Sequence, residues 1–188
     1  MVTNICPIEN LIIVPLRPDD AEEMFAGLSD EQGYHFIPDE PPATIEALRE
    51  RYVMLSSGGL PDGSEIWLNW IIRYGDENAA AGYTQATISG NDALIGYHVF
   101  PAFWRQGIGA ASLTLTLEEV FARDDVTTAR AFVDTRNIAS VHLLEKLGFS
   151  RINTINSAEF FKNNYSNEYE YIYEKEKWIS RPLSPDRY

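Results

Sequence analysis

The chain has 188 residues, of which 45% are hydrophobic and 23% are charged, and a formal net charge of -13 at pH 7. These values are typical of a soluble domain with a full hydrophobic core. The acidic balance argues against nucleic acids and anionic membranes as partners, because both need a basic surface. It is compatible with a cationic partner, such as an amine or a basic peptide, and equally with an acidic surface that only keeps the protein soluble.

The single cysteine, Cys6, cannot form an internal disulfide and leaves no cysteine-based metal site. The first residues lack the basic and apolar regions of a signal peptide, and no apolar run reaches the roughly 20 residues that cross a bilayer. We therefore expect a cytoplasmic protein, folded as one domain over residues 1–188. Its core should span 10–178 and its C-terminal tail should be loosely held.

The first third of the chain predicts a strand, two helices and a loop. LIIVPLR (11–17) is strand-like. The helix of 18–28 begins with a proline and two acids, which suit a helix N-terminus, and continues with apolar residues at helical spacing. GYHFIPDEPPA (33–43) is rich in proline and aromatic residues, which indicates an ordered loop. A second helix should follow Thr44, a suitable N-cap, and extend to Leu55.

The middle of the chain predicts an antiparallel meander. EIWLNWIIR (65–73), GYTQATI (82–88) and ALIGYHVF (93–100) all have strand character. SGND (89–92) is a hairpin turn signal between the second and the third of these strands.

The last third predicts alternating strands and helices. Residues 113–117 fit a strand or a helix, and the length of the apolar pattern favours a helix. The further expected elements are a strand at 128–134, a helix at 137–148, a short strand at 149–155, a loop at 156–167 and a last strand at 168–178. The order describes a mixed α/β domain with a βαβ-like unit at 93–134.

The glycine-rich stretch FWRQGIGAAS (103–112) has the features of an anion site. Gly107 and Gly109 permit close backbone approach, and the N–H groups and dipole of the helix that begins there favour a phosphate. Arg105 can add a positive charge. The lysine of a nucleotide-triphosphate loop is missing, and Ser112 stands where a dinucleotide fingerprint needs its third glycine. A glycine turn without function remains the alternative.

Two segments resemble the GNAT superfamily of acetyl-CoA-dependent N-acetyltransferases. YHVFPAFWRQGIGAAS (97–112) is similar to the strand and pyrophosphate loop of that family, and DTRNIASVHLLEKLGF (134–149) to its Asn-x-x-Ser-x-x-Leu-Leu-Glu-Lys-Leu-Gly-Phe signature. The stretch 11–28 resembles the opening strand and helix. Details of both motifs look like the subgroup of ribosomal-protein N-terminal acetyltransferases. The resemblance implies an acyl-CoA N-acyltransferase fold, with a mostly antiparallel twisted sheet that splays at the cofactor strand.

The resemblance also implies acetyl-CoA as co-substrate, without a metal. The implied cofactor-binding residues are Val99, Phe100, Arg105, Gln106, Gly107, Ile108, Gly109, Ala110, Asn137 and Ser140. Many family members carry a tyrosine where this chain has Leu144, so the usual proton donor to the departing thiolate is missing here. Ser140, which falls on one helical face with Asn137, would hydrogen-bond the sulfur instead. A helix cap for Asn137 and a packing role for Ser140 are the structural alternatives.

The implied reaction is direct attack of a primary amine on the thioester, with the oxyanion held by a backbone N–H near Val99. The amine must lose a proton first. His98 titrates nearest to neutrality and is one candidate base, although a structural role fits it equally. The other candidates are Glu65, Glu168, Asp39 and Glu40. His35 and His142 are expected to be structural, and the three dispersed histidines make no metal site.

The acceptor site should lie among the variable segments 33–42, 67–70 and 156–167. Tyr34, Phe36, Trp67 and Asn69 are the candidate acceptor residues, and they suit an amine with an apolar body; a core position is the alternative for Trp67. The acceptor is a small molecule or a peptide or protein N-terminus, and a homodimer is common in such folds. A non-catalytic acyl-CoA-binding module and an unrelated nucleotide binder are the alternative functions.

Overall fold

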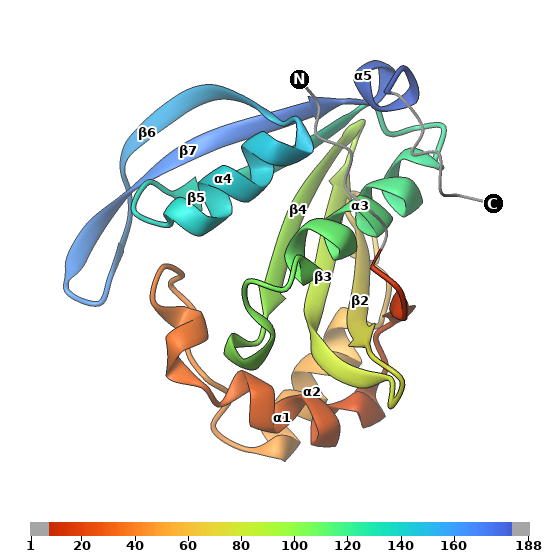
Figure 1. Ribbon diagram of the computed structural model, residues 1–188, viewed down its shortest axis with the longest axis vertical. Coiled ribbons are helices and arrows are strands. Elements are labelled where there is room, and N and C mark those ends of the chain that lie inside the picture. The colour runs from red at the N-terminus through yellow and green to blue at the C-terminus, as the bar shows by residue number, and fades with distance from the viewer. Residues whose placement is uncertain (1–7, 182–188) are drawn as a thin grey trace.

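The structure, a computed structural model, describes residues 8–181. Seven strands form one sheet in the order β1-β2-β3-β4-β5-β7-β6, with helices packed against both faces (Figure 1). The predicted mixed α/β class with a mostly antiparallel sheet is confirmed. Cys6 and residues 182–188 of the predicted tail lie outside the described residues. Within 8–181, no helix is both long and apolar enough to cross a bilayer.

The strand and the two helices predicted for the N-terminal part form, and two 3-10 turns join them. They are β1 Leu11–Pro15, a 3-10 turn Pro18–Asp20, α1 Ala21–Leu28, a 3-10 turn Glu31–Tyr34 and α2 Ile45–Leu55. Thr44 caps α2, because its Oγ1 accepts the N–H of Ala47 at 3.1 Å. Between the two helices the chain is a loop apart from its 3-10 turn, as its prolines predict.

The meander is also confirmed. Its strands are β2 Ile66–Tyr74, β3 Ala79–Ser89 and β4 Asp92–Val99, each antiparallel to the next. After β4 a 3-10 turn, Pro101–Phe103, leads into the glycine-rich loop.

The βαβ unit follows. Helix α3, Ile108–Phe121, crosses from β4 to β5, Thr128–Asp134, and the two strands are parallel. Leu113, Leu117 and Val120 are all fully buried, a spacing that belongs to one helical face and explains why 113–117 is not a strand.

Helix α4, Ile138–Leu147, has both predicted caps. Asn137 precedes it, and Gly148 ends it with a φ of 100°, a left-handed conformation that glycine adopts without strain.

The end of the chain differs from the prediction. β6, Ser150–Phe161, and β7, Asn164–Glu174, form one long hairpin, so the loop expected at 156–167 does not exist. Lys162 and Asn163 both have positive φ, as a two-residue hairpin turn requires. The last strand stops at Glu174, and α5, Lys175–Ile179, replaces its predicted end.

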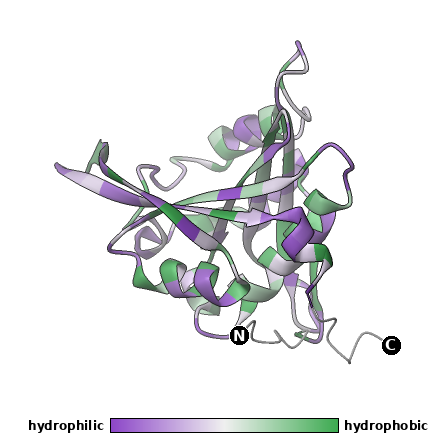
Figure 2. Ribbon diagram, turned by 90° about the horizontal axis from the view of Figure 1, so that it is seen from above, coloured by the Kyte–Doolittle hydropathy of each residue, from purple (hydrophilic) through white to green (hydrophobic). Residues whose placement is uncertain are grey.

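Two hydrophobic layers sandwich the sheet. Helices α3, α4 and α5 pack on one face in a cluster that includes Trp70, Leu117 and Leu144. Helices α1 and α2 pack on the other face around Ile71 and Phe100. The helical ribbons alternate between hydrophobic and hydrophilic residues, as this one-sided burial requires (Figure 2).

The sheet opens between its two central strands. In Figure 1, β4 runs downward while β6 and β7 curve away to the left, so that the strands diverge. Among the described residues, β4 and β5 pair only over Asp92–Leu94 and Thr128–Arg130. The far half of β4 therefore has a free edge on the side of β5, which is the predicted splay.

Candidate functional site

The glycine-rich loop lies at the end of β4 and the start of α3. Gly107 is the N-cap of α3 with a φ of 82°, and Arg105 before it has a φ of 61°. The first hydrogen bond of the helix runs from the N–H of Ala110 to the carbonyl of Gly107. The N–H groups of Ile108 and Gly109 precede that bond, so they are free to bind an anion at the positive end of the helix dipole.

The free edge of β4 presents backbone groups next to this loop. The N–H of Phe100 donates to Ala81 on β3 at 2.9 Å. Hydrogen bonding alternates along an antiparallel strand, so the N–H groups of Tyr97 and Val99 point away from β3, toward β5. The Val99 carbonyl accepts the indole N–H of Trp104 at 2.7 Å, which ties the loop to the strand end. Phe100 itself has its side chain buried against α1 and α2.

Three elements converge at Gly109. A Cβ added there would lie 2.8 Å from Leu143 on α4 and 3.7 Å from Val99 on β4. The absence of a side chain thus lets the N-terminus of α3 approach both α4 and the free strand edge. Gln106 contributes differently, since its amide donates to the carbonyl of Ala102 and stabilises the loop.

The start of α4 lies beside the free edge of β4. The Oδ1 of Asn137 accepts the N–H of Ser140 at 3.1 Å, so Asn137 is a helix cap, which leaves its amide N–H groups for other partners. Burial raises the pKa of the Tyr97 hydroxyl to about 12, and its approach to Ser140 partly opposes that shift. Leu144 is fully buried in the core.

A role for the side chain of Tyr97 was not predicted from the sequence. Its hydroxyl is buried and has no hydrogen-bond partner of acceptable geometry, which is a costly arrangement in a free protein. Only its alternation with His98 along β4 hinted at its position. Tyr97 and Ser140 therefore bring two hydroxyl groups close together between β4 and the first turn of α4.

His98 faces the opposite side of the sheet, toward α1 and α2. It stacks on Tyr83 with ring centroids 5.5 Å apart and touches Tyr34 and Phe100. Burial lowers the pKa of His98 to about 4, and Asp39 and Asp30 oppose this only in part. The imidazole is thus neutral and a weak base at pH 7, which disfavours His98 as the general base.

The buried His98 predicts a pH-dependent stability. Its folded pKa lies below the ordinary value of about 6.5, so the unfolded chain binds a proton that the folded chain does not bind between pH 6.5 and 4. Folding is therefore destabilised as the pH falls through this window, by about 2 kcal/mol at pH 4.5. Urea unfolding of wild type and of His98→Phe, which keeps a ring, should show a smaller loss from pH 7 to 4.5 in the variant. Equal losses would contradict the neutral burial of this histidine.

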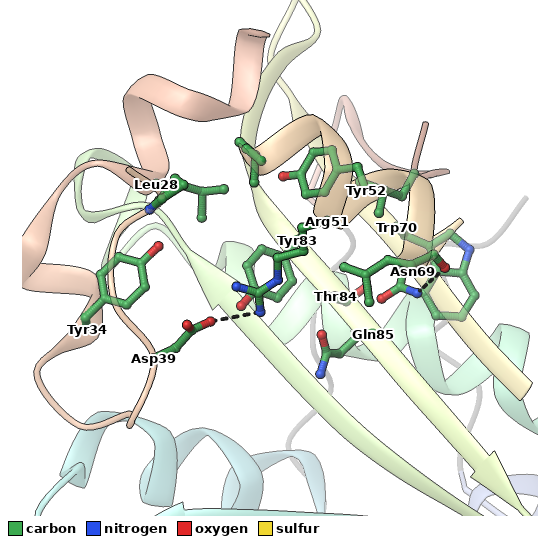
Figure 3. Close-up of a pocket in the computed structure, with 14 residues that line it drawn as sticks. Leu28, Tyr34, Asp39, Arg51, Tyr52, Asn69, Trp70, Tyr83, Thr84 and Gln85 are labelled. Atoms are coloured by element: carbon green, nitrogen blue, oxygen red, sulfur yellow. Dashed lines mark hydrogen bonds and ion pairs between the residues drawn. The ribbon is translucent and has the colours of Figure 1, made fainter. Parts of the chain in front are cut away.

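A pocket lies on the α1/α2 face of the sheet, beside His98 (Figure 3). It encloses about 480 Å³ of empty space, including open solvent at its mouth. The lining residues come from α1, α2, the loop between them, β2 and β3; they are Leu16, Leu28, Tyr34, Asp39, Pro42, Leu48, Arg51, Tyr52, Leu55, Asn69, Trp70, Tyr83, Thr84 and Gln85. The pocket is mainly apolar and aromatic, with a few polar groups, as small-molecule sites are.

The only formal charges of this pocket are a pair. Arg51 donates to Asp39 at 2.9 Å, and the guanidinium projects into the pocket in front of Tyr83 (Figure 3). Burial raises the pKa values of Tyr34, Tyr52 and Tyr83, so all three hydroxyl groups stay protonated at pH 7.

The predicted acceptor residues are only partly brought together. Tyr34 and Asn69 line the pocket, with the Asn69 amide donating to Leu55 at 3.0 Å. Trp67 does not line this pocket; its indole N–H donates to Glu65 at 2.9 Å. Phe36 does not line it either, and packs edge-on against His35.

The β6–β7 hairpin reaches the same face. Lys162 at its tip donates to the carbonyls of Tyr34 and Ile37, which joins the hairpin to the loop between α1 and α2. On β7, Glu168 pairs directly with Asp134 of β5. Burial raises the pKa of the Glu168 carboxyl, and the nearby Glu159 and Asp134 raise it further.

The remaining candidates are placed on the surface. His35, His142 and Glu40 are exposed. Within residues 8–181, no group of three or more histidine, cysteine, aspartate or glutamate side chains is arranged to hold a metal ion.

A sequence profile of the acetyltransferase (GNAT) domain matches residues 10–150. The chain belongs to this family. It is therefore an N-acetyltransferase by family, and the matched region contains the glycine-rich loop, the split strands and α4. The profile does not separate subgroups, so the likeness to ribosomal-protein acetyltransferases stays a prediction.

Individual relatives are distant. The uncharacterized N-acetyltransferase YoaA of Bacillus subtilis (strain 168) is 24% identical over 146 residues, which covers 76% of this chain and 81% of YoaA. A spermidine N-acetyltransferase from Vibrio cholerae, solved with CoA and spermine, is 16% identical, with a TM-score of 0.78 over 92% of this chain and 100% of that one. RimL, a ribosomal L7/L12 alpha-N-protein acetyltransferase solved with coenzyme A, is 18% identical, with a TM-score of 0.79 over 92% and 98%. At these identities the structures show the shared fold.

Proposed function

We propose that this protein transfers the acetyl group of acetyl-CoA to a primary amine of a small molecule or of a peptide N-terminus, by direct attack on the thioester. The main support is that the glycine-rich loop, the free edge of β4 and the start of α4 meet at Gly109. The chain also belongs to the GNAT family. RimL and the spermidine N-acetyltransferase share this fold and were solved with CoA, which supports acetyl-CoA as the co-substrate.

In this proposal the co-substrate lies along the opening between β4 and β5. Its pyrophosphate accepts hydrogen bonds from the backbone N–H groups of the loop between Arg105 and Ala110, and Arg105 adds a positive charge. Its pantetheine arm pairs with the free backbone groups of Tyr97 and Val99, as an added strand would. The Asn137 amide donates to the same arm.

The acetyl group then lies where charge develops during attack. The N–H of Val99 is the proposed donor to the oxyanion of the tetrahedral intermediate. Collapse of the intermediate breaks the C–S bond, and the departing thiolate takes up the proton that the attacking nitrogen loses, while the hydroxyls of Tyr97 and Ser140 donate hydrogen bonds to that sulfur. Since the pKa of Tyr97 is raised to about 12, the hydroxyl stays protonated and available as a donor at every working pH.

Glu168 is the proposed base for the incoming ammonium. Tyr169 and Tyr171 pack with α4 on one face of β7, so Glu168 points to the other face, which also carries the pocket. Its raised pKa brings its basicity closer to neutral pH. Glu168→Gln should lower kcat about a hundredfold and remove the acidic limb of the pH–rate profile. Glu174→Gln, at the exposed end of the same strand, is the control. An unchanged acidic limb of the pH–rate profile in Glu168→Gln would exclude Glu168 as the base.

The function is tested by thiol release from acetyl-CoA across a panel of primary amines and peptides, with mass spectrometry of the acceptor. The proposal expects thiol release that depends on the acceptor, and an acceptor heavier by one acetyl group. Binding of acetyl-CoA without any acceptor-dependent release would instead indicate a non-catalytic module.

A further inference from the structure

We propose that the pocket between α2 and β3 selects an acceptor with a carboxylate, so that the substrate is a primary amine with an apolar body and a carboxylate at its far end. This inference rests on the proposed function and names the acceptor class. It starts from Arg51 and Tyr52, two neighbouring residues of α2 that both line the pocket.

Arg51 has N–H donors that are available to a ligand. Its Nη2 donates to Asp39, and its remaining N–H groups have no hydrogen-bond partner among the described residues. A guanidinium presents five donors in a fork that matches the two oxygens of a carboxylate. One carboxylate oxygen of a ligand can therefore bind Arg51 while Asp39 keeps its own bond.

Tyr52 offers a second, independent donor. The residue is only 4% exposed, and its hydroxyl is buried without a hydrogen-bond partner. Figure 3 shows this hydroxyl on the inner side of α2, directed toward the pocket. A buried hydroxyl without a partner destabilises the free protein, and a ligand oxygen at this position would remove that cost.

The charge balance of the pocket favours an anion over a second cation. The chain has a net charge of -13, yet the charges of Arg51 and Asp39 cancel in the lining. An ammonium group would have to compete with Arg51 for Asp39, the one acid present, and would leave the Tyr52 hydroxyl without an acceptor. A carboxylate instead meets donors from both residues.

The walls and the position of the pocket define the rest of the acceptor. Leu28, Leu48 and Leu55 supply apolar walls for an apolar body. The reactive edge of β4 is close, because Tyr83 and Gln85 on β3 pair with His98 and Gly96 on β4. Gly96 has no side chain, and the nearest group to it is the flexible side chain of Gln85.

The length of the acceptor follows from the sheet geometry. One to two strand spacings, roughly 5–10 Å, separate the pocket on β3 from the free edge of β4. The amine and the carboxylate should therefore stand at opposite ends of the molecule. An extended dipeptide, at ~3.5 Å per residue, and a linear ω-amino acid have this reach.

The test compares acids with their amides as acceptors. Leucyl-phenylalanine and its C-terminal amide form one pair, 6-aminohexanoate and 6-aminohexanamide form another, and spermidine is a polyamine without a carboxylate. With wild-type protein, kcat/KM should be at least about tenfold higher for each acid than for its amide, as one charge-assisted contact provides. This comparison needs no variant and does not depend on one folding.

Variants then assign the preference to residues. Arg51→Met should abolish the preference by raising KM for the acids alone, and Tyr52→Phe should reduce it several-fold. Arg49→Met is the matched control, because Arg49 lies on the same helix and pairs with Glu22 outside the pocket. Asp39→Asn should keep or strengthen the preference, since Arg51 is then free for the ligand.

The outcomes separate this inference from the proposed function. Equal use of acids and amides, or a preference for spermidine that Asp39→Asn abolishes, overturns the carboxylate inference and leaves acetyl transfer intact. A preference for acids that Arg51→Met and Tyr52→Phe both retain also overturns it, because the carboxylate then binds elsewhere. Acetylation of none of these acceptors, nor of any wider amine panel, overturns the proposed function together with this inference.

Discussion

Gly107→Val is expected to raise the dissociation constant for acetyl-CoA about a hundredfold. Gly107 has a φ of 82°, where a β-branched residue is strained by about 1–2 kcal/mol or more. The loop escapes this strain by changing its conformation, and the N–H groups of Ile108 and Gly109 then no longer converge on the pyrophosphate. Calorimetric titration of both proteins with acetyl-CoA measures the effect.

Gly75→Val is the matched control for this variant. Gly75 has a φ of 79°, lies in the turn between β2 and β3, and has open space where a Cβ would be added. The same backbone strain is introduced there, far from the loop. Equal affinity for acetyl-CoA in Gly107→Val and in wild type, with the variant folded, would remove the glycine-rich loop from the proposed binding site.

Tyr97→Phe is expected to lower kcat about ten- to a hundredfold while leaving the affinity for acetyl-CoA nearly unchanged. The change removes only the hydroxyl that we propose faces the departing sulfur, and preorganised donors of this kind contribute about this much to rate. Because the hydroxyl is buried without a partner in the free protein, its loss should keep or raise the melting temperature. Saturating kinetics and thermal unfolding measure the two effects separately.

The two hydroxyls that we propose for the sulfur, those of Tyr97 and Ser140, can be ranked in the same experiment. Ser140→Ala should have the smaller effect on kcat, since Tyr97 remains as a donor, and the double variant should lose more than either single one. Tyr173→Phe, on β7 where the ring packs against Phe121 and Trp178, controls for the loss of a buried tyrosine hydroxyl. A full kcat in Tyr97→Phe would assign stabilisation of the leaving group to another donor.

Local signals in the sequence were sufficient where residues near in sequence decide the structure. Asn137 and Gly148 predicted the two ends of α4, and in the structure they are its N-cap and C-cap. The glycine-rich loop and α4 were predicted to belong to one site, and the contact of Gly109 with Leu143 shows that they meet. The helical assignment of 113–117 followed from the length of the surrounding apolar pattern, which a strand would not sustain.

The β6–β7 hairpin could not be predicted from its sequence in the same way. Its turn, Lys162 and Asn163, lacks the Asn-Gly or Asp-Gly signal that marks a two-residue hairpin. The strand residues around it are largely polar because the hairpin extends beyond the core, so they lack the apolar alternation that identifies a half-buried strand.

The pocket could not be predicted from the sequence because its lining residues come from separate elements. Arg51 and Tyr52 belong to a helix whose sequence pattern predicts only an apolar face. No neighbouring residue in the sequence indicates that the Tyr52 hydroxyl lacks a hydrogen-bond partner. The orientation of His98 was also undetermined, because alternation along β4 fixes which residues share a face but not which face meets α1 and α2. Tertiary packing decides both.

We propose that the co-substrate lies along the free edge of β4, and a crystal structure of the protein with coenzyme A would test this placement. This placement predicts pyrophosphate oxygens about 3 Å from the N–H groups of Ile108 and Gly109. It also predicts the pantetheine arm against the backbone of Tyr97 and Val99, and the sulfur within hydrogen-bond reach of the Tyr97 hydroxyl. A pyrophosphate bound away from the glycine-rich loop, or a sulfur remote from Tyr97 and Ser140, would contradict it.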